Sequence, residues 1–371
     1  MTGASGISGA ADRGFPVWGG PAERLRFLLQ WAVLAPSRHN AQPWLFEIEG
    51  DEVRMYADLT RALPASDPDG RQLLMSCGAA LVNLRLAAAH FGHATTSELV
   101  PGVRRDGLLA RVRLEERCSS TPEVEEMFQA IPRRRTNRLP LDGREPPEGL
   151  VTALLREARR EGAWLRPIEE RERVPVAELV AEGDEQQLSS SRFRAELSRW
   201  VRPNGTPRRD GMPGYALGMS DAVAMLHPLL VRLGSTAREH ADRDRRRATT
   251  CKALLLLSTP RDGKVEWLAA GEAMQRILLR AASRGLFASY FMQPIELPDL
   301  RRRLRDLLVD PGAPQILFRL GYGLEVRPVP RRPVGEVLRG YEEHRPRAEA
   351  LAVRTPPPIA APGGVAHSPL Q

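Results

Sequence analysis

Two short polar stretches carry the residue types most suited to chemistry, and the first of them spans residues 36–44 with the sequence PSRHNAQPW. Asn40 and Gln42 each offer both hydrogen-bond donors and acceptors, which suits the edge of a heterocycle. Pro36 and Pro43 stiffen the stretch, and Trp44 supplies an aromatic anchor. A helix cap followed by a turn would explain the same residues, so the stretch by itself leaves both interpretations open.

The second stretch spans residues 133–138 and reads RRRTNR, directly after Pro132. Guanidinium groups bind phosphate through two parallel hydrogen bonds, and a threonine hydroxyl adds a further donor. A phosphate-binding loop and a solvated basic loop are both compatible with this composition.

The elements that must position these stretches follow from hydrophobic periodicity and turn residues. In the first part of the chain we expect a helix at 21–34, strands at 45–49 and 52–57 joined at Gly50-Asp51, a long helix at 73–91 closed by Gly92, and a strand at 108–114. In the second part we expect helices at 148–161, 222–233, 267–284 and 298–308 and strands at 253–258 and 315–320.

The two parts resemble each other at one offset. Placing Gly78 on Gly271 also places Gly92 on Gly285, which is a common shift of 193 residues. Chance matching of alanine-rich helices is the alternative to a true repeat. If the repeat is real, the small-residue faces of the two long helices pack on each other, and the molecule is a dimer fused into one chain. A ligand site is then expected where the halves meet.

Taken together, the two stretches resemble the nitroreductase superfamily of FMN-dependent oxidoreductases. The pattern P-S-x-x-N-x-Q-P-W occurs at 36–44, and R-x-[ST]-x-[KR] occurs at 134–138. The Gly321-Tyr322-Gly323 turn and the basic pair before Pro333 resemble the closing strand and C-terminal basic residues of the family. The resemblance covers about residues 25–338. His39 within the motif and the segment 210–215 are similar to the Acg-type subgroup.

The resemblance implies an α+β, nitroreductase-like fold with antiparallel-type sheets flanked by helices, arranged as a pseudo-dimer of two halves in one chain. In ordinary members the arginine loop precedes P-S-x-x-N-x-Q-P-W, and two subunits share each flavin; here the order is inverted. Fusion of complementary halves explains the inversion and predicts one FMN per chain. The implied cofactor-binding residues are Pro36, Ser37, Arg38, Asn40, Gln42, Met292, Gln293, Pro294, Arg134, Arg135, Thr136, Arg138, Arg331 and Arg332.

The resemblance also assigns roles within that set. Arg134, Arg331 and Arg332 would neutralise the FMN phosphate, with Arg135 and Thr136 close by. Arg138 would approach the N1/O2 edge, where a positive charge stabilises the reduced flavin. Residues 36–42 would line the ring and ribityl chain, and the backbone of 292–294 would contact N5.

The implied function is an oxidoreductase that moves hydride from NAD(P)H to the flavin and on to a small acceptor such as a quinone or nitro compound. Because the cofactor performs the chemistry, no side chain is expected as catalytic acid or nucleophile. The insertion at about 184–250 is predicted to be a lid over the flavin, or else a helical hairpin that only buries surface. A protein that sequesters FMN under a closed lid with little turnover is the alternative function.

Composition sets further expectations. We expect tails at 1–20 and 341–371, a first half at 21–130 and a second half at 131–340. Cys77, Cys118 and Cys251 show no C-x-x-C spacing, and no leader or spanning segment is evident, which predicts a cytoplasmic protein without membrane contact. His90 and His93 lack a carboxylate third ligand, so no metal is expected. A monomer or weak homodimer is expected.

The chain has more basic than acidic residues, and nearly all of the basic ones are arginines. Of 54 basic residues, 52 are arginines, and the net charge is +8. Nucleic-acid binding would account for this charge, but 5% aromatic content and no docking motif weigh against it. The run at 243–247 is expected to be a solvated helix face.

Overall fold

The computed structural model describes residues 14–100, 107–233 and 237–340. The chain up to Arg339 forms one compact unit. The predicted tails at 1–20 and 341–371 lie mostly outside the described residues.

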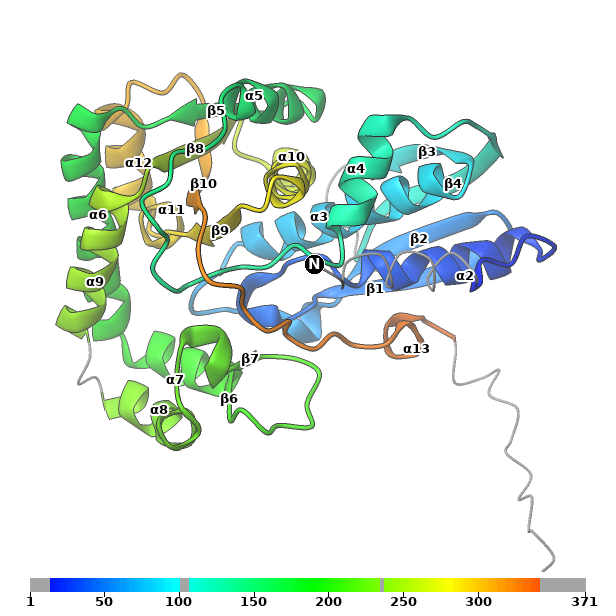
Figure 1. Ribbon diagram of the computed structural model, residues 1–371. Helices are drawn as coiled ribbons and strands as arrows, with labels where there is room; N and C mark the ends of the chain where they lie inside the picture. Colours follow the sequence, from blue (N-terminus) through cyan, green and yellow to red (C-terminus); the bar gives the residue numbers. More distant parts are fainter. Residues whose placement is uncertain (1–13, 101–106, 234–236, 341–371) are drawn as a thin grey trace, which may run out of the picture. The chain divides into compact units, whose positions relative to one another are not determined.

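The first half is built on a four-stranded antiparallel sheet with strand order β1-β2-β4-β3. Its strands are β1 (Trp44–Glu49), β2 (Glu52–Ala57), β3 (His93–Leu99) and β4 (Leu108–Arg117). The helices of this half are α2 (Pro21–Ala32), α3 (Arg71–His90) and α4 (Pro122–Ala130) (Figure 1). Gly50 has a φ of 62° in the β1–β2 turn, the left-handed conformation that glycine adopts without strain. The predicted hairpin is therefore confirmed.

The second half repeats this plan with a second antiparallel sheet of order β5-β8-β10-β9. Its strands are β5 (Trp164–Pro167), β8 (Ala253–Thr259), β9 (Phe287–Tyr290) and β10 (Ala313–Gly321). Its helices are α5 (Leu150–Arg160), α10 (Lys264–Ser283), α11 (Gln293–Glu296) and α12 (Pro298–Leu307). The connection between α4 and α5 contains residue 131, and we propose it as the boundary between the halves.

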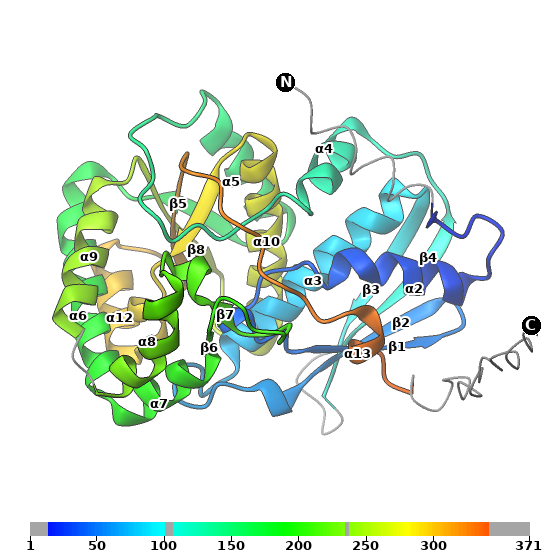
Figure 2. The ribbon, with the colours of Figure 1, turned by 60° about the horizontal axis from the view of Figure 1, so that its bottom comes forward.

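The two halves pack through α3 and α10, which Figure 2 shows crossing between the sheets. A Cβ atom on Gly78 would lie 2.1 Å from the carbonyl oxygen of Leu268, and one on Gly271 would lie 2.0 Å from that of Met75. Met75 and Leu268, like Gly78 and Gly271, are 193 residues apart. The close approach is thus the same on both sides of the crossing, and the fused pseudo-dimer predicted from the repeat is confirmed.

Both long helices also end in the same way. Gly92 follows α3 with a φ of 82°, and Gly285 follows α10 with a φ of 78°. A left-handed glycine after the last turn satisfies free carbonyl groups and stops the helix. The sequence prediction of both helix ends is confirmed to within three residues.

The connection from β5 to β8 forms a helical insertion. It contains α6 (Glu170–Ser189), α7 (Ser191–Trp200), β6 (Val201–Arg202), β7 (Met212–Pro213), the 3-10 helix η4 (Gly214–Leu217), α8 (Asp221–Leu233) and α9 (Ala237–Thr250). Helices α6 and α9 lie side by side (Figures 1 and 2). The inserted helices therefore begin at Glu170, earlier than the position near 184 expected from the sequence.

After β10 the chain returns from the second half to the first. Leu141 pairs with Gly323 beside the second sheet, and Leu338 pairs with Phe46 of β1. The short helix α13 (Val334–Val337) lies at the end of this return (Figure 1). We refer to residues 324–338 as the return segment.

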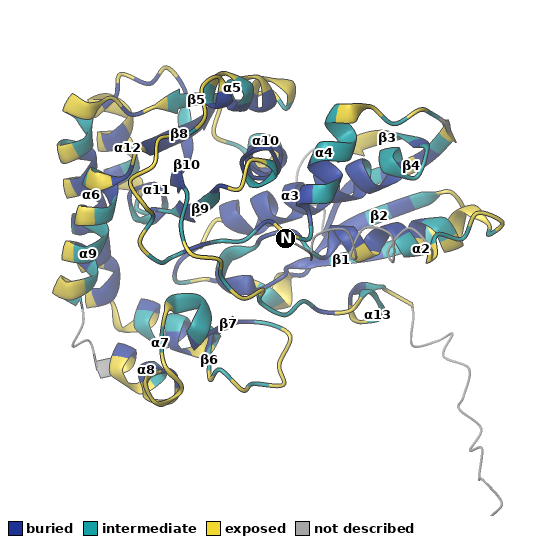
Figure 3. Ribbon diagram, viewed as in Figure 1, coloured by how far each residue is buried: buried dark blue, intermediate teal, exposed yellow. Residues whose placement is uncertain are grey.

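The centre of the fold is apolar. Figure 3 shows α3 and α10 buried along most of their length. Among the described residues α3 is the one helix whose length and composition would suffice to cross a membrane, and 83% of its most apolar window is buried in the protein, as in a core helix.

Candidate functional site

The backbone of the 36–44 loop adopts a conformation that is uncommon for its residues. His39, Asn40 and Gln42 have φ values of 51°, 55° and 54°, although none is glycine. Such conformations persist only where the surroundings hold them, and they cluster at functional loops. Here the Ser37 hydroxyl accepts a 2.9 Å hydrogen bond from the Gln42 amide, and Arg61 donates to the Ala41 carbonyl.

The arginine loop, residues 133–138, follows α4 and runs beside β9 of the second sheet. The Asn137 amide donates to the Ala288 carbonyl at 2.9 Å, and Thr136 pairs with the same residue. The Asn137 side chain donates to the Leu324 carbonyl of the return segment at 2.8 Å. One predicted stretch is thus held by the first half and the other by the second.

The two stretches meet in a cavity of about 150 Å³, which we call the arginine cavity. Asn40 and Arg134 both line it, together with Arg331 from the return segment. In all it is lined by five arginines, namely Arg134, Arg135, Arg138, Arg327 and Arg331, and no aspartate or glutamate lies in its lining. The structure therefore brings together residues that are far apart in the sequence and concentrates positive charge between them.

Within the described part of the chain, these guanidinium groups form no ion pair with an aspartate or glutamate. Arg134 is 5% exposed, and its Nε and Nη1 atoms find no hydrogen-bond partner among the described residues. Burial lowers the pKa of Arg134 to about 10 and that of Arg331 to about 9, since desolvation disfavours the charged form. The Arg331 side chain is oriented by a 2.9 Å hydrogen bond to Asn40 Oδ1. A buried cation without a counter-charge is costly, so the arginine cavity has the electrostatics of an anion site.

A larger cavity of about 290 Å³ adjoins the first. The two share Pro36, Ser37, Thr136, Arg138 and Met212 in their walls. Burial lowers the pKa of the Arg138 guanidinium to about 10. Five methionines line the larger cavity, namely Met75, Met212, Met219, Met274 and Met292. Methionine side chains are flexible and polarizable and make favourable contacts with aromatic rings, so this wall suits a flat aromatic ligand.

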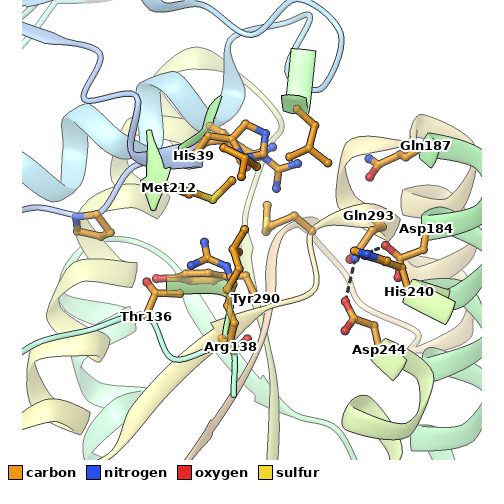
Figure 4. A pocket seen from close by; sticks show the side chains of 18 of the residues that line it. His39, Thr136, Arg138, Asp184, Gln187, Met212, His240, Asp244, Tyr290 and Gln293 are labelled. Carbon is orange, nitrogen blue, oxygen red and sulfur yellow. Dashed lines mark hydrogen bonds between the residues drawn. The ribbon is translucent and has the colours of Figure 1, made fainter. Parts of the chain in front are cut away.

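Polar groups stand at two sides of the larger cavity (Figure 4). On one side His39 lies near Arg138 and Tyr290, and burial, followed by the charge of Arg38, holds the pKa of His39 well below its usual value. Its Nε2 atom has no hydrogen-bond partner. His39 is therefore neutral and can either donate or accept a hydrogen bond on the cavity side.

On the other side Gln293 of α11 faces two carboxylates of the insertion. Its Nε2 atom donates to Asp184 Oδ1 at 2.8 Å and lies 3.4 Å from Asp244 Oδ2 (Figure 4). Burial and the negative charge of Asp244 raise the pKa of Asp184 to about 7. Burial also lowers the pKa of the neighbouring His240 to about 4. We call Asp184, Asp244 and Gln293 the carboxylate corner.

Most of the residues implied by the family resemblance line one of the two cavities. These are Pro36, Ser37, Arg38, Asn40, Arg134, Arg135, Thr136, Arg138, Met292, Gln293 and Arg331. The guanidinium of Arg38 is engaged in an ion pair with Glu296 at 2.8 Å. Its charge is thus already compensated within the protein.

Three implied residues lie outside both linings. The Gln42 side chain donates to the Arg209 carbonyl at 2.7 Å and accepts from the Arg332 amide. The Arg332 guanidinium contacts the Glu336 carbonyl and the carboxylate of Asp58. Pro294 is buried in α11. Gln42 and Arg332 therefore stabilise the 36–44 loop through hydrogen bonds and do not line either cavity.

Sequence reasoning missed the contribution of α9. Arg243, Asp244 and Arg247 line the larger cavity, so the expectation that the 243–247 run is entirely a solvated face is wrong. The signal was present, because residues three and four apart in a helix share one face, and His240 precedes Arg243 and Asp244 at that spacing. What the sequence lacked was the position of α9 beside the cavity.

A further missed feature is the attachment of the insertion to the loop. Asn40 Nδ2 donates to the Gly211 carbonyl at 2.9 Å, and the Gly211 amide lies 3.3 Å from the Asn40 carbonyl oxygen. Asn40 Nδ2 also lies 3.1 Å from the Pro330 carbonyl. Asn40 thus connects the loop, the insertion and the return segment.

Comparison with known proteins assigns the family. A putative NAD(P)H nitroreductase of Mycobacterium tuberculosis is 30% identical over 327 residues, which cover 87% of this chain and 93% of the relative. The putative NAD(P)H nitroreductase acg of the same species is 30% identical over 85% of this chain and 95% of its own length. An uncharacterized protein of that species is 33% identical over 83% and 90%. No family model matches the sequence.

Comparison with solved structures matches nitroreductases. The FMN-dependent nitroreductase NfnB of Mycobacterium smegmatis, in complex with NADPH, aligns with a TM-score of 0.35 and 15% identity over 57% of this chain and 96% of that chain. A nitroreductase of Bacteroides fragilis with bound FMN aligns with a TM-score of 0.33 and 13% identity over 56% and 93%.

The two antiparallel sheets, the crossed helices and the arginine-lined seam define an α+β protein of two fused, similar halves. With relatives of 30% identity along nearly their whole length, the chain belongs to the nitroreductase family and within it to the Acg-type group.

Proposed function

We propose that this protein is an FMN-dependent oxidoreductase that uses NAD(P)H to reduce small acceptors such as quinones or nitro compounds. The observation that carries the proposal is the arginine cavity, where the buried Arg134 and four further arginines, which form no ion pair within the described residues, adjoin a larger, methionine-lined cavity. A phosphate dianion would supply the missing counter-charge, and a flat ring would suit the methionines.

The residues present fit FMN. Arg134, Arg135 and Arg331 would hold the phosphate, and the Thr136 hydroxyl would add a donor. Pro36, Ser37 and Asn40 line the same cavity from the first half. Arg138 belongs to both linings, so its charge can act on a ring that extends from one cavity into the other.

The chemistry that a bound flavin supplies is acceptance of hydride and its delivery as electrons to a second molecule. The chain contributes binding, orientation and charge. Arg138 would stabilise the negative charge of the reduced ring, and the positive cavity would favour the charged phosphate. Phe193, Leu197 and Leu217 of the insertion line the larger cavity and would help to keep water from a bound ring.

The test is the visible spectrum of the purified full chain, with and without added FMN, followed by identification of the released chromophore. We expect a flavin spectrum with one FMN per chain and bleaching by NAD(P)H that a quinone reverses. A colourless protein that does not take up added FMN would refute the proposal.

A second candidate function, sequestration of FMN with little turnover, is favoured by the hydrogen bonds that fasten Gly211 of the insertion to Asn40 of the loop. Steady-state NADPH oxidation with quinones or nitroaromatics separates the two functions. A yellow protein that NAD(P)H does not bleach would support sequestration. Deletion of residues 205–220 should then restore bleaching, whereas an unchanged flavin accessibility would remove the lid hypothesis.

We further propose that the chain acts in the cytoplasm and without a partner subunit at the flavin. Its three cysteines are free, which suits a reducing compartment. Residues of both predicted loops line one cavity of a single chain, which supports a flavin site that needs no partner subunit. Sedimentation of the FMN-loaded protein over a range of concentrations measures the association state, and FMN occupancy should not depend on it.

A further inference from the structure

We propose that the carboxylate corner binds the hydrogen-bond donor groups of the second substrate. The preferred ligands are planar aromatic compounds that carry an amide or amidine group, and Asp184 selects them against aromatic acids. This inference rests on the proposed function for the neighbouring ring but concerns a separate part of the larger cavity. None of the residues of the corner lines the arginine cavity.

The position of the corner supports a separate subsite. Asp184 lies on α6, Asp244 on α9 and Gln293 at the start of α11. Figure 4 shows these side chains across the cavity from His39, Thr136 and Arg138, which stand at the wall near the arginine cavity. A ligand that contacts the methionine-lined middle can therefore reach the corner with a polar substituent.

The corner presents unpartnered acceptors. Asp184 is 7% exposed, and its Oδ2 atom has no hydrogen-bond partner in the part of the chain that the structure describes, although Oδ1 accepts from Gln293. The Gln293 Nε2 atom is directed to the two carboxylates, which leaves Oε1 buried and without a partner. Buried polar atoms are nearly always satisfied, so two unpartnered acceptors on a cavity wall indicate a ligand or water with N–H or O–H groups.

The charges around the corner indicate which ligand suits it. Asp244 is compensated by Arg247 at 2.9 Å, and Glu296 by Arg38 at 2.8 Å. Asp184 has no ion pair within the described parts of the chain. A cationic or donor group would compensate Asp184, whereas an aromatic carboxylate would add a further negative charge. Because Asp184 has no ion pair, a second negative charge placed beside it is disfavoured, so the corner selects ligands by charge.

Other titratable groups face Asp184 from the packed elements. Arg243 on α9 favours the ionised form, whereas Asp244 on α9 and Glu296 on α11 oppose it. Burial keeps His240 neutral near pH 7. Because the pKa of Asp184 is raised to about 7, its ionised fraction grows between pH 6 and pH 8. Binding of a cation should strengthen over the same interval.

The experiment uses benzamidine, benzamide and benzoate, which share one ring and differ in the charge and donors of one substituent. Calorimetric titrations are made with the full chain saturated with FMN at pH 8. We expect benzamidine and benzamide to bind at least about tenfold more tightly than benzoate. The benzamidine affinity should rise about tenfold from pH 6 to pH 8, in proportion to the ionised fraction of a group with a pKa near 7.

Variants assign the effect to the corner. Asp184→Asn should weaken benzamidine binding about tenfold and remove its pH dependence, since the amide keeps the shape and loses the charge. Gln293→Met should weaken benzamide binding and serves as a second test if the first variant folds poorly. Asp306→Asn, on the exposed side of α12, is the matched control and should leave all three affinities unchanged.

The outcomes separate this inference from the proposed function. FMN content is measured by absorbance on the same sample, and absence of FMN binding counts against the proposed function alone, because the probe titrations are repeated on the protein as isolated. Equal or tighter binding of benzoate, no binding of any probe, or an unchanged affinity in Asp184→Asn would overturn the inference.

Discussion

Replacement of Arg134 by methionine should strengthen the fold of the FMN-free protein and weaken FMN binding. The opposite signs follow from one observation, namely that the guanidinium is buried and has no acidic partner. Methionine has a similar length and carries no charge, so it removes the desolvation penalty while still filling the space.

The magnitude follows from the pKa. Burial lowers the pKa of Arg134 from its usual value above 12 to about 10. At neutral pH the group is charged in both the folded and unfolded states, so the folded protein bears the full penalty throughout this range. At about 1.4 kcal/mol per unit the penalty is about 3 kcal/mol, or about 4 °C in Tm for a chain of this size. Loss of a charge-assisted phosphate contact should weaken FMN binding about 10- to 150-fold.

The assay combines thermal unfolding of the FMN-free protein with a fluorescence titration of FMN. Arg133→Met is the matched control, because Arg133 is the exposed neighbour, donates a hydrogen bond to the Gln129 carbonyl and lines neither cavity. It should change neither quantity. A lower Tm for the FMN-free Arg134 variant, or an unchanged FMN affinity, would show that the cavity is not an anion site and would refute the reasoning.

Three further predictions concern the frame of the site. Gly271→Val should prevent stable folding or lower Tm by more than 5 °C, about 3 kcal/mol or more, because even a Cβ at this position would lie 2.0 Å from the backbone of α3; an unchanged melting curve would contradict the crossing. Asn40→Ala should free the insertion from the loop, so limited proteolysis within 205–220 should become several times faster; equal cleavage rates would show that the hydrogen bonds do not restrain the segment. Asp262→Asn should remove the part of the folding stability that is lost at low pH through this carboxylate. Hydrogen bonding and ion pairing with Arg71 hold the pKa of Asp262 at about 2, below its usual value. Its contribution to stability is therefore present above pH 4 and lost as the pH falls towards 2. Because the carboxylate is partly exposed, about 1 kcal/mol is expected at pH 7, and pH-dependent urea unfolding measures it.

The sequence predicted best those elements whose physical determinants are local. The β1–β2 hairpin has a glycine at the position that needs a left-handed backbone, and α3 and α10 both end at such glycines. The edge strand β3 was not predicted, because its residues are largely polar and lack an apolar run. Pairing with β4, which is a long-range contact, stabilises that segment as a strand.

By itself, the sequence determined the two loops, the repeat of 193 residues and hence a fused pair of similar halves, since these depend on residue identity and spacing. Only the tertiary structure decided which side chains face a cavity. In the folded protein Gln42 accepts a hydrogen bond from the Arg332 amide and neither residue lines either cavity, whereas Arg38 pairs with Glu296. The tertiary structure also brings Asp184 and Asp244 to the far side of the larger cavity. The physical reason is that the direction of a side chain depends on the elements packed around it, and those elements come from distant parts of the chain.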